Sequence, residues 1–258
     1  FGDALYLVAT YESVPVSSNF DNLLAGGTVQ HWVNDHVKLG ITGQYEEAGT
    51  GFDDKTMLSA NATIRKTADS YIKAEYTITD GGAFSENSSI DGGYSFNNQA
   101  ASNLGKASAY LVEAAIDIND VSDKLEGKVT GYYREREAGF SGTGQAVLQD
   151  TTQYGGAINV PFNENQSAAT LAYDHTDTSN NTQERASLDV RHQVTDAINV
   201  GIGVAYEDNS ATGSTVDVAG EIRYTDADNW SVWVFGQGSV YQDSNVDANN
   251  RVGVGVQT

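Results

Sequence analysis

Residues 198–207 have the sequence INVGIGVAYE, which places a large apolar or aromatic side chain at every even position and a small or polar one at every odd position. Residues 216–224, VDVAGEIRY, repeat this two-residue period after a short polar interruption. Such alternation is typical of a β-strand with one face toward an apolar environment and the other toward water. The two stretches therefore predict neighbouring amphipathic strands.

The same alternation runs along almost the whole chain. Most of the periodic stretches are about 10–12 residues long, which is enough for a tilted strand to cross a bilayer. Their number, about 14, is even, as it is in single-chain bacterial barrels. The sequence therefore predicts an all-β fold, a transmembrane antiparallel up-and-down β-barrel of about 14 strands, with residues 1–258 forming one outer-membrane domain. The predicted strands are 3–13, 26–33, 36–47, 55–66, 70–80, 107–118, 124–136, 151–161, 167–176, 183–194, 197–208, 214–224, 229–242 and 250–258.

The composition favours long paired strands and argues against several other classes of protein. The 258 residues include 2 prolines, so proline rarely removes a donor from a strand ladder. They include no cysteine, so disulfides and thiolate metal sites are excluded. The formal net charge of −21 argues against nucleic acid as a partner, because the phosphate backbone is also negative.

The connections between the predicted strands alternate in length. Those at one end, such as 34–35, are short and rich in Asp and Asn, whereas 81–106, 137–150, 177–182 and 209–213 lie at the other end and are mostly longer. Short periplasmic turns and long extracellular loops are the expected asymmetry of an outer-membrane barrel. The longest loop, 81–106, either folds into the lumen as a constriction or covers the mouth.

Tyrosines mark a common height on the apolar faces. Every predicted strand that climbs toward the long loops, except 229–242, carries a tyrosine on its apolar face near the upper end. Tyrosine is amphipathic and favours the boundary between hydrocarbon and headgroups, so these residues predict an aromatic girdle. The predicted upper ring consists of Tyr11, Tyr45, Tyr76, Tyr133, Tyr173 and Tyr206, and Tyr224 and Trp230 belong to a lower ring.

The polar faces carry most of the charged strand residues, with acids and bases in similar numbers. A wide lumen with these charged rows would be a water-filled pore, and an acidic mouth would favour cations. If the same charges pair across strands instead, the lumen narrows and the barrel becomes a non-conducting anchor. The predicted pore-lining residues are Lys38, Arg65, Lys73, Glu75, Glu113, Asp117, Glu126, Lys128, Arg134, Asp174, Arg185, Asp189, Arg191, Asp217, Glu221 and Arg223.

Two strands fit the alternation poorly. A two-residue turn at Asn34-Asp35 would carry Trp32 outward, but it would carry Gln30 outward as well. In the predicted strand 229–242, Trp233 and Phe235 lie on the inward face. This placement indicates packing in the lumen, a bulge, or different strand limits.

The sequence predicts no enzyme site. Asp174-His175 is similar to the aspartate–histidine pair of outer-membrane proteases, but alternation places adjacent residues on opposite faces. The other histidines, His31, His36 and His192, have neither a paired serine nor metal-ligand spacing, and surface or interfacial roles are expected for them.

No metal or cofactor is predicted either. The alternating oxygen ligands Asp243, Asn245, Asp247 and Asn249 are similar to the start of a calcium loop. The glycine and the closing glutamate of that pattern are missing, so we expect a solvated acidic loop.

Alternating strands, aromatic strand ends, short Asp/Asn turns and acidic loops together resemble the architecture of bacterial porins. This resemblance implies a barrel surrounded by outer-membrane lipid and passed by small hydrophilic solutes. Residues 128–140, KVTGYYREREAGF, resemble a stretch in the C-terminal barrels of very large surface proteins of Gram-negative bacteria, which implies an anchor within a larger chain. Many outer-membrane barrels end in an aromatic residue, whereas this sequence ends Val256-Gln257-Thr258. We therefore expect the barrel to be incomplete at its C-terminus.

Three functions follow from the sequence. The first is a passive pore for small hydrophilic solutes, and the second is a barrel that anchors or translocates a larger surface protein. The third is a soluble or adhesive β-sandwich or β-solenoid, because a sandwich shows the same alternation with its apolar face inward.

Overall fold

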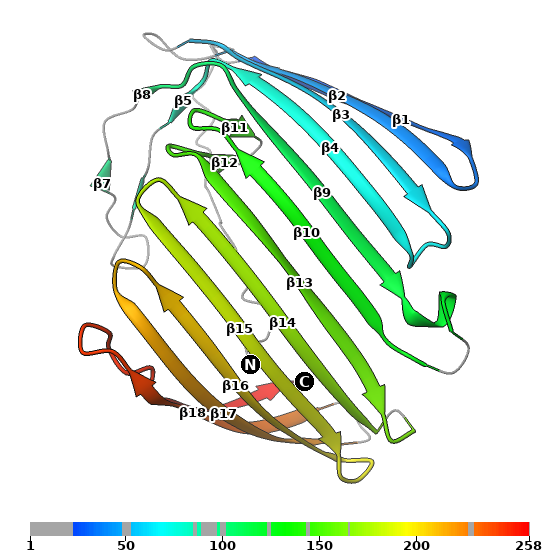
Figure 1. Ribbon diagram of the computed structural model, residues 1–258, viewed down its shortest axis with the longest axis vertical. Coiled ribbons are helices and arrows are strands. Elements are labelled where there is room, and N and C mark those ends of the chain that lie inside the picture. Colours follow the sequence, from blue (N-terminus) through cyan, green and yellow to red (C-terminus); the bar gives the residue numbers. More distant parts are fainter. Residues whose placement is uncertain are drawn as a thin grey trace.

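The computed structural model describes residues 23–47, 53–84, 87–88, 97–98, 102–122, 125–142, 145–164, 166–226 and 230–257. Its main feature is one large antiparallel sheet in which thirteen strands follow one another in chain order (Figure 1). The predicted all-β, up-and-down antiparallel fold is therefore confirmed. The strands are β1 (Leu24–Asn34), β2 (Val37–Glu46), β3 (Lys55–Arg65), β4 (Tyr71–Asp80), β9 (Ala107–Asp117), β10 (Lys128–Arg136), β13 (Thr151–Phe162), β14 (Ser167–Thr178), β15 (Asn181–Gln193), β16 (Ile198–Asn209), β17 (Gly213–Thr225), β18 (Ser231–Gln242) and β19 (Arg251–Gln257).

Short elements lie in the connections. Between β4 and β9, β5 (Ala83–Phe84) pairs with β8 (Ser102–Asn103), and β6 (Asn87–Ser88) pairs with β7 (Asn97–Asn98). Between β10 and β13, β11 (Ser141–Gly142) pairs with β12 (Gln145–Ala146). A single 3-10 turn, η1 (Ile118–Asp120), follows β9. Among the described residues, no helix is both long enough and apolar enough to cross a membrane.

The predicted strand limits agree with the structure at nearly every element. The largest error is at β10, which begins at Lys128 and not at residue 124. The predicted strand 3–13, with Tyr11, lies outside the described residues.

Two connections are shorter than expected. Thr178 pairs with Asn181, so residues 179–180 alone join β14 to β15, and Asn209 pairs with Gly213, so residues 210–212 alone join β16 to β17. The prediction of longer loops at 177–182 and 209–213 is therefore wrong, because strand pairing continues to the last residues. The long-loop end of the sheet is instead made by 47–54, 81–106, 137–150 and 243–250, and the opposite end is the short-turn end.

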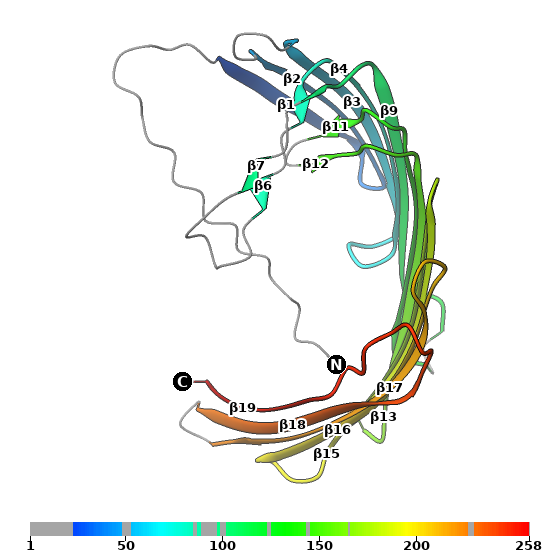
Figure 2. The same cartoon turned by 90° about the vertical axis from the view of Figure 1, so that its left-hand side faces the viewer.

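The sheet curls into a trough with a concave and a convex face (Figure 2). The β11–β12 hairpin lies on the concave side, and Ser141 in it donates its backbone N–H to the Thr79 hydroxyl at 3.1 Å. Thr79 therefore points to the concave side, and so do Thr77, Glu75 and Lys73, which alternate with it. The polar strand faces line the concave face, and the apolar strand faces form the convex face.

The convex face exposes its apolar side chains. Leu58, Ile202 and Ile222 are 63%, 65% and 62% exposed, whereas Thr79 on the concave side has an exposed fraction of 0%. A sandwich would bury the apolar face under a second sheet. In the described part of the chain, the only other sheets are the two-stranded pairs in the connections, so the apolar face has no such cover.

The described strands form a curled sheet and not a closed barrel. Within the described residues, β1 pairs with β2 alone and β19 pairs with β18 alone. Because β1 and β19 are the first and the last of thirteen antiparallel strands, they run in the same direction, from the long-loop end toward the short-turn end.

A bulge in β1 moves Trp32 to the concave face. Asn34 pairs with Val37, but Trp32 pairs with Lys38, so Val33 is an extra residue in the strand. The prediction that Trp32 faces outward is therefore wrong. The shift also carries Gln30 inward, which resolves the poor fit of this strand to the alternation.

A second bulge lies near the end of β18. Asp217 pairs with Ser239 and Val216 with Tyr241, so Val240 is the extra residue. Before the bulge, Trp233 remains on the concave face as the partner of Arg223, and after it Tyr241 lies on the convex face. β18, which the sequence predicts to lack an apolar-face tyrosine, therefore carries one, Tyr241.

Candidate functional site

The concave face is the candidate functional site, because it collects the charged residues that the sequence predicts to line a pore. One predicted residue is misplaced: Glu126 precedes β10 and lies in the connection at the short-turn end, because the strand begins at Lys128. The register of the sheet places the others on the concave face: Lys38, Arg65, Lys73, Glu75, Glu113, Asp117, Lys128, Arg134, Asp174, Arg185, Asp189, Arg191, Asp217, Glu221 and Arg223.

One row of direct cross-strand partners crosses this face and carries both acids and bases. We call it the central row. Its members, from β2 to β16, are Lys38, Thr63, Lys73, Glu113, Tyr132, Gly155, Asp174, Arg185 and Glu207.

Lys73 of the central row bridges two carboxylates, one in the row and one beside it. Its Nζ lies 3.6 Å from Glu75 Oε2 and 3.8 Å from Glu113 Oε1, and the Ser59 hydroxyl donates to Glu75 Oε1 at 2.9 Å. The charged side chains are 32–34% exposed, so water screens the ion pairs. Each pair then contributes at most about 1 kcal/mol, and the network mainly fixes where the charges lie.

Tyr132 reaches across a glycine to Asp174. Its hydroxyl donates to Asp174 Oδ2, and Gln153 Nε2 donates to Asp174 Oδ1 at 3.2 Å. Gly155 lies between them in the register, and a Cβ there would be 3.1 Å from the Tyr132 ring and 3.0 Å from Asp174 Oδ2. Because Gly155 on β13 has no side chain, the Tyr132 hydroxyl on β10 can reach the Asp174 carboxylate on β14.

Aromatic rings pack on glycines near the β19 edge. The Trp233 ring lies over Gly255, where a Cβ would come within 2.2 Å of the ring, and the Phe235 ring lies over Gly253 at 2.5 Å by the same measure. Arg223 stacks on the Trp233 ring, with its guanidinium carbon 4.4 Å from the centroid. The inward aromatics of this strand therefore pack on the concave face. At the other edge of the sheet, the Arg65 guanidinium stacks in the same way on the Trp32 ring, with its carbon 3.8 Å from the centroid.

The β11–β12 hairpin covers the concave face at the long-loop end. Ala107, Phe140 and Val147 form a small buried apolar core beneath it. Lys55 Nζ donates to the Gly142 carbonyl at 3.5 Å, which joins the hairpin to β3. The connection 137–150 therefore takes up part of the opening of the trough.

The longest connection begins with two glycines. Gly81 and Gly82 have φ of +77° and +99°, a region that favours glycine. Gly82 N–H donates to the Asp53 carbonyl at 3.0 Å, and its carbonyl accepts from Leu104 N–H at 2.9 Å. β5, β7 and β8 lie beyond the strand ends in Figure 1, and β6 and β7 lie on the concave side in Figure 2. Of the two arrangements predicted for 81–106, its described parts fit a cover over the mouth.

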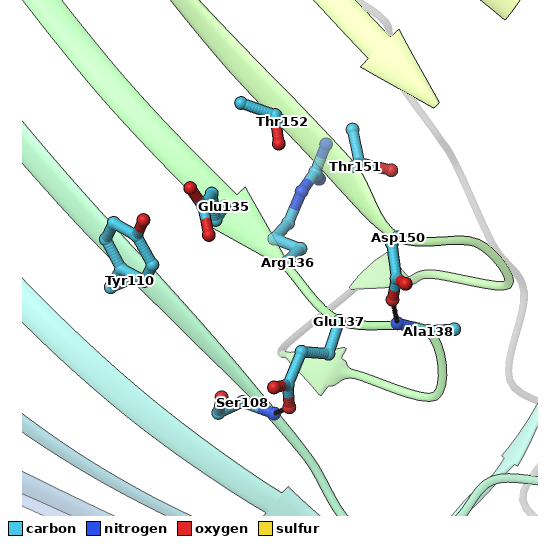
Figure 3. A pocket seen from close by; sticks show the side chains of 9 residues that line it. All are labelled: Ser108, Tyr110, Glu135, Arg136, Glu137, Ala138, Asp150, Thr151 and Thr152. Atoms are coloured by element: carbon cyan, nitrogen blue, oxygen red, sulfur yellow. Dashed lines mark hydrogen bonds between the residues drawn. The ribbon is translucent and has the colours of Figure 1, made fainter. Parts of the chain in front are cut away.

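A cavity of about 450 Å³ opens at the long-loop rim between β9, β10 and β13 (Figure 3). Glu137 accepts from the Ser108 N–H at 2.7 Å, and Asp150 accepts from the Ala138 N–H at 2.8 Å. Glu137 therefore braces the start of the connection 137–150 against β9, and Asp150 joins the two ends of this connection. The cavity is lined by Ser108, Tyr110, Glu135, Arg136, Glu137, Ala138, Asp150, Thr151 and Thr152.

Tyrosines form a row on the convex face at the long-loop end. Ring centroids are 5.8 Å apart for Tyr110 and Tyr133, 6.3 Å for Tyr133 and Tyr154, and 6.3 Å for Tyr154 and Tyr173. Tyr110 and Tyr154 lie on strands that descend from the long loops, and the predicted upper ring does not include them. The tyrosine row consists of Tyr45, Tyr76, Tyr110, Tyr133, Tyr154, Tyr173, Tyr206 and Tyr241; the other predicted member, Tyr11, lies outside the described residues.

The tyrosine row descends in steps across the register. Tyr76 is the direct partner of Tyr110, but the partner of Tyr110 on β10 is Glu135, two residues beyond Tyr133. Tyr154 is the direct partner of Tyr133, and its partner on β14 lies two residues beyond Tyr173. A line at constant height crosses the register in such steps when strands tilt, as they do in barrels.

Carboxylates lie at both edges of the apolar band, where they accept hydrogen bonds from tyrosine hydroxyls. At the long-loop edge, the Tyr45 hydroxyl donates to Asp54 at 2.6 Å and the Tyr241 hydroxyl to Asp243 at 2.8 Å. At the short-turn edge, the Tyr224 hydroxyl donates to Asp226 at 3.2 Å, and its ring lies 5.5 Å from that of Trp230. Tyr224 and Trp230 thus meet as the predicted lower ring requires. The tyrosines turn their rings to the apolar band and their hydroxyls to charged groups.

Neighbouring turns are joined at the short-turn end. Asp120 Oδ2 accepts from the Thr67 and Ser70 hydroxyls at 2.6 and 2.5 Å, so the turn after β3 holds the turn after β9. These hydrogen bonds favour the charged carboxylate and hold the pKa of Asp120 below its usual value. Lys128 adds an ion pair to Asp69 at 3.6 Å.

The histidines form contacts, some of which the sequence did not indicate. Asp174 and His175 lie on opposite faces, as expected. On the convex side, His175 Nδ1 lies 3.1 Å from Glu184 Oε1. His192 Nδ1 lies 2.9 Å from the Ser167 hydroxyl, so the interpretation that it has no paired serine is wrong. In the described part of the chain, no carboxylate binds the other ring nitrogen of His192, so this pair lacks the third group of a catalytic triad.

The oxygen-rich stretch before β19 binds the sheet itself. Asp243 accepts from the Ser214 N–H at 2.7 Å, and Asn249 donates to Asp217 at 3.1 Å. Both ends of the stretch therefore contact β17. Among the described residues, no group of three or more potential metal ligands comes together.

No protein-family model matches the chain, and no curated protein matches its sequence. The resemblance to porins therefore rests on architecture alone. The structure places residues 128–140 in β10 and the start of the connection that follows it.

Proposed function

We propose that this chain forms the wall of a bacterial outer-membrane pore through which small hydrophilic solutes diffuse passively. The observation that carries the proposal is the distribution of side chains over the two faces of the sheet. Polar side chains line a concave trough, and large apolar side chains are exposed on the convex face. Water on one face and hydrocarbon on the other satisfy this distribution, as in membrane barrels.

The dimensions of the apolar band support a membrane position. Ile198 is the partner of Tyr224 at the lower edge, and Tyr206 on the same strand belongs to the upper tyrosine row. At about 3.3 Å per residue, the interval between them is about 26 Å along the strand. With a tilt of about 40°, it spans roughly 20 Å of height, close to the band of about 25 Å in outer-membrane barrels.

A pore needs a closed wall, and the strand directions specify how it would close. Because β1 and β19 run in the same direction, an antiparallel barrel needs one climbing strand between them. Residues 3–13 have the sequence DALYLVATYES, with Leu5, Leu7, Ala9 and Tyr11 on one face. They would give the fourteenth strand, with Tyr11 at the height of the tyrosine row.

A preference for cations follows from the charge of the mouth. Carboxylates at the long-loop end include Glu137, Asp150 and Asp243, whereas acids and bases are nearly balanced on the concave face. An acidic entrance raises the local concentration of cations and lowers that of anions.

One structural feature favours the alternative, a non-conducting anchor for a larger surface protein. The β11–β12 hairpin covers part of the mouth and is joined to β3 and β4 through Lys55 and Thr79. A lumen narrowed in this way would carry little current.

Conductance in planar bilayers tests the proposal. The purified protein is expected to give stable ohmic steps, with a reversal potential in a salt gradient that indicates preference for cations. A variant lacking residues 138–149 should show larger steps, because the hairpin no longer takes up the mouth. Silence from both proteins, with heat-modifiable gel migration showing that both are folded, would contradict a pore and support the anchor.

A further inference from the structure

We propose that the concave face holds a binding site for small zwitterionic solutes, such as free α-amino acids, between Arg185 and Asp174. The proposal rests on the proposed pore in one respect, since solutes reach the concave face through the lumen. It adds a solute class that charge balance alone does not specify.

Arg185 is the arginine of the central row, and its charge acts on the Asp174 carboxylate without an ion pair or hydrogen bond between them within the described residues. It lies in the central row between Asp174 on β14 and Glu207 on β16, and its side chain is exposed to the trough. Asp174 is held by Tyr132 and Gln153, on the side away from Arg185. Within the described residues, the Arg185 guanidinium forms neither an ion pair nor a hydrogen bond.

Glu207 is occupied as well. Its Oε1 accepts a hydrogen bond from Gln183 Nε2 at 2.9 Å, so a neutral amide on the strand of Arg185 takes the place of the guanidinium. Two carboxylates thus flank a cation without contacting it. Each keeps acceptor capacity, because a carboxylate can accept about four hydrogen bonds.

The space for a solute is a cavity of about 370 Å³ beside this part of the central row. Small side chains provide it: Ala157, Ala172 and Ser187 are direct cross-strand partners next to the row. Tyr132, Asp174 and Arg185 lie in its lining, and the two charged residues of the lining are Asp174 and Arg185. The volume lies at the small end of the range for small-molecule sites, about 300–1,000 Å³.

The arrangement of charges selects the solute class. The planar guanidinium of Arg185 matches a carboxylate with two parallel hydrogen bonds. Asp174 and Glu207 together outweigh its charge, so a simple anion bound there would be repelled by the flanking carboxylates. A solute with a carboxylate for Arg185 and an ammonium group for Asp174 satisfies all three residues.

Three other concave-face arginines do not offer such a site. Arg223 is stacked on Trp233 and contacts Glu221 at 3.2 Å, and Arg134 donates to Gln153. Arg191 is exposed on the same strand as Arg185, but its cross-strand partners are Ala168 and Gly201. It carries the same charge without flanking carboxylates, which makes it a matched control.

Equilibrium binding to the detergent-solubilised protein tests the site without requiring conduction. Three probes separate the charges: L-glutamine is zwitterionic, N-acetyl-L-glutamine carries only the negative charge, and L-glutamine amide carries only the positive one. Calorimetric titration should show saturable binding of L-glutamine, with the two analogues about tenfold weaker or more. Arg185→Gln should weaken L-glutamine by about tenfold or more, since a charge-assisted hydrogen bond is lost. Arg191→Gln should leave it unchanged.

Asp174→Asn provides the second arm. Removing its negative charge should reduce the preference for L-glutamine over N-acetyl-L-glutamine, because the repulsion of a simple anion falls. Equal binding of the three probes, or no effect of Arg185→Gln in a protein that is still folded, would overturn the site. Such a result would leave the pore intact if the bilayer currents persist, whereas binding without any current would overturn the pore and leave the site.

Discussion

The two faces of the sheet obey different rules. On the convex face, side chains of one kind repeat, and Val200, Ile202 and Val204 of β16 could exchange places with little change in their surroundings. On the concave face each side chain has particular partners, as Tyr132 has Asp174 across Gly155, and Trp233 has Gly255.

This difference shows which part of the sequence carries which information. The convex face needs only an apolar band of the right height, so its energy depends on the environment it meets and not on specific neighbours. The concave face depends on register, because a slip of one residue would separate every pair named above. Substitutions should therefore be judged by environment on one face and by partner on the other.

A charge in the middle of the convex face should have the largest effect. Ile202→Lys would place an ammonium group in the apolar band, and we expect a loss of about 2–4 kcal/mol in the free energy of unfolding from lipid vesicles. Ser187→Lys puts the same charge on the concave face, where polar and charged side chains gather, and should cost much less. Urea titration followed by tryptophan fluorescence measures both, and equal losses would contradict a lipid-facing convex surface.

A methyl group placed under an aromatic ring tests the concave face. Gly255→Ala would put a Cβ 2.2 Å from the Trp233 ring, and the displaced ring should cost about 1–3 kcal/mol. Gly236→Ala on the convex face meets nothing within 4 Å and should stabilise the strand by about 0.5–1 kcal/mol. The two variants are the same substitution on adjacent strands, and the same urea titration compares them. Effects of the same sign would show that the faces do not differ as described.

The fold could be predicted because its signal is local. Alternation in residues 198–207 and 216–224 reports the environment of each strand face without reference to any neighbour, and antiparallel order follows from short connections. Strand limits failed mainly at residues 124–127, where polar and apolar residues still alternate although pairing has ended. The tyrosine of β18 was missed because the extra residue Val240 reverses the alternation there.

The contacts of the concave face could not be predicted, since they depend on pairing between strands. Trp32 changed face because Val33 bulges, and no residue type in the turn signals this bulge. The packing of Trp233 did leave a signal, because Gly253 and Gly255 alternate with the same spacing as Phe235 and Trp233. That signal is readable only once β18 and β19 are known to be neighbours in register.

The smallest effect concerns the tyrosine row, the one place where the convex face has specific partners. The rings of Tyr133 and Tyr154 are nearly parallel, at 11° and 6.3 Å, so a double-mutant cycle to leucine should give a coupling of about 0.5–1.5 kcal/mol. Tyr173 and Tyr206 provide the control, because Ala186 lies between them in the register and their coupling should be near zero. Equal coupling in both pairs would mean that the tyrosines act only through their common position at the edge of the apolar band. Coupling in the stacked pair alone would mean that neighbouring strands also recognise each other through this row, which would make it part of the register as well as of the band.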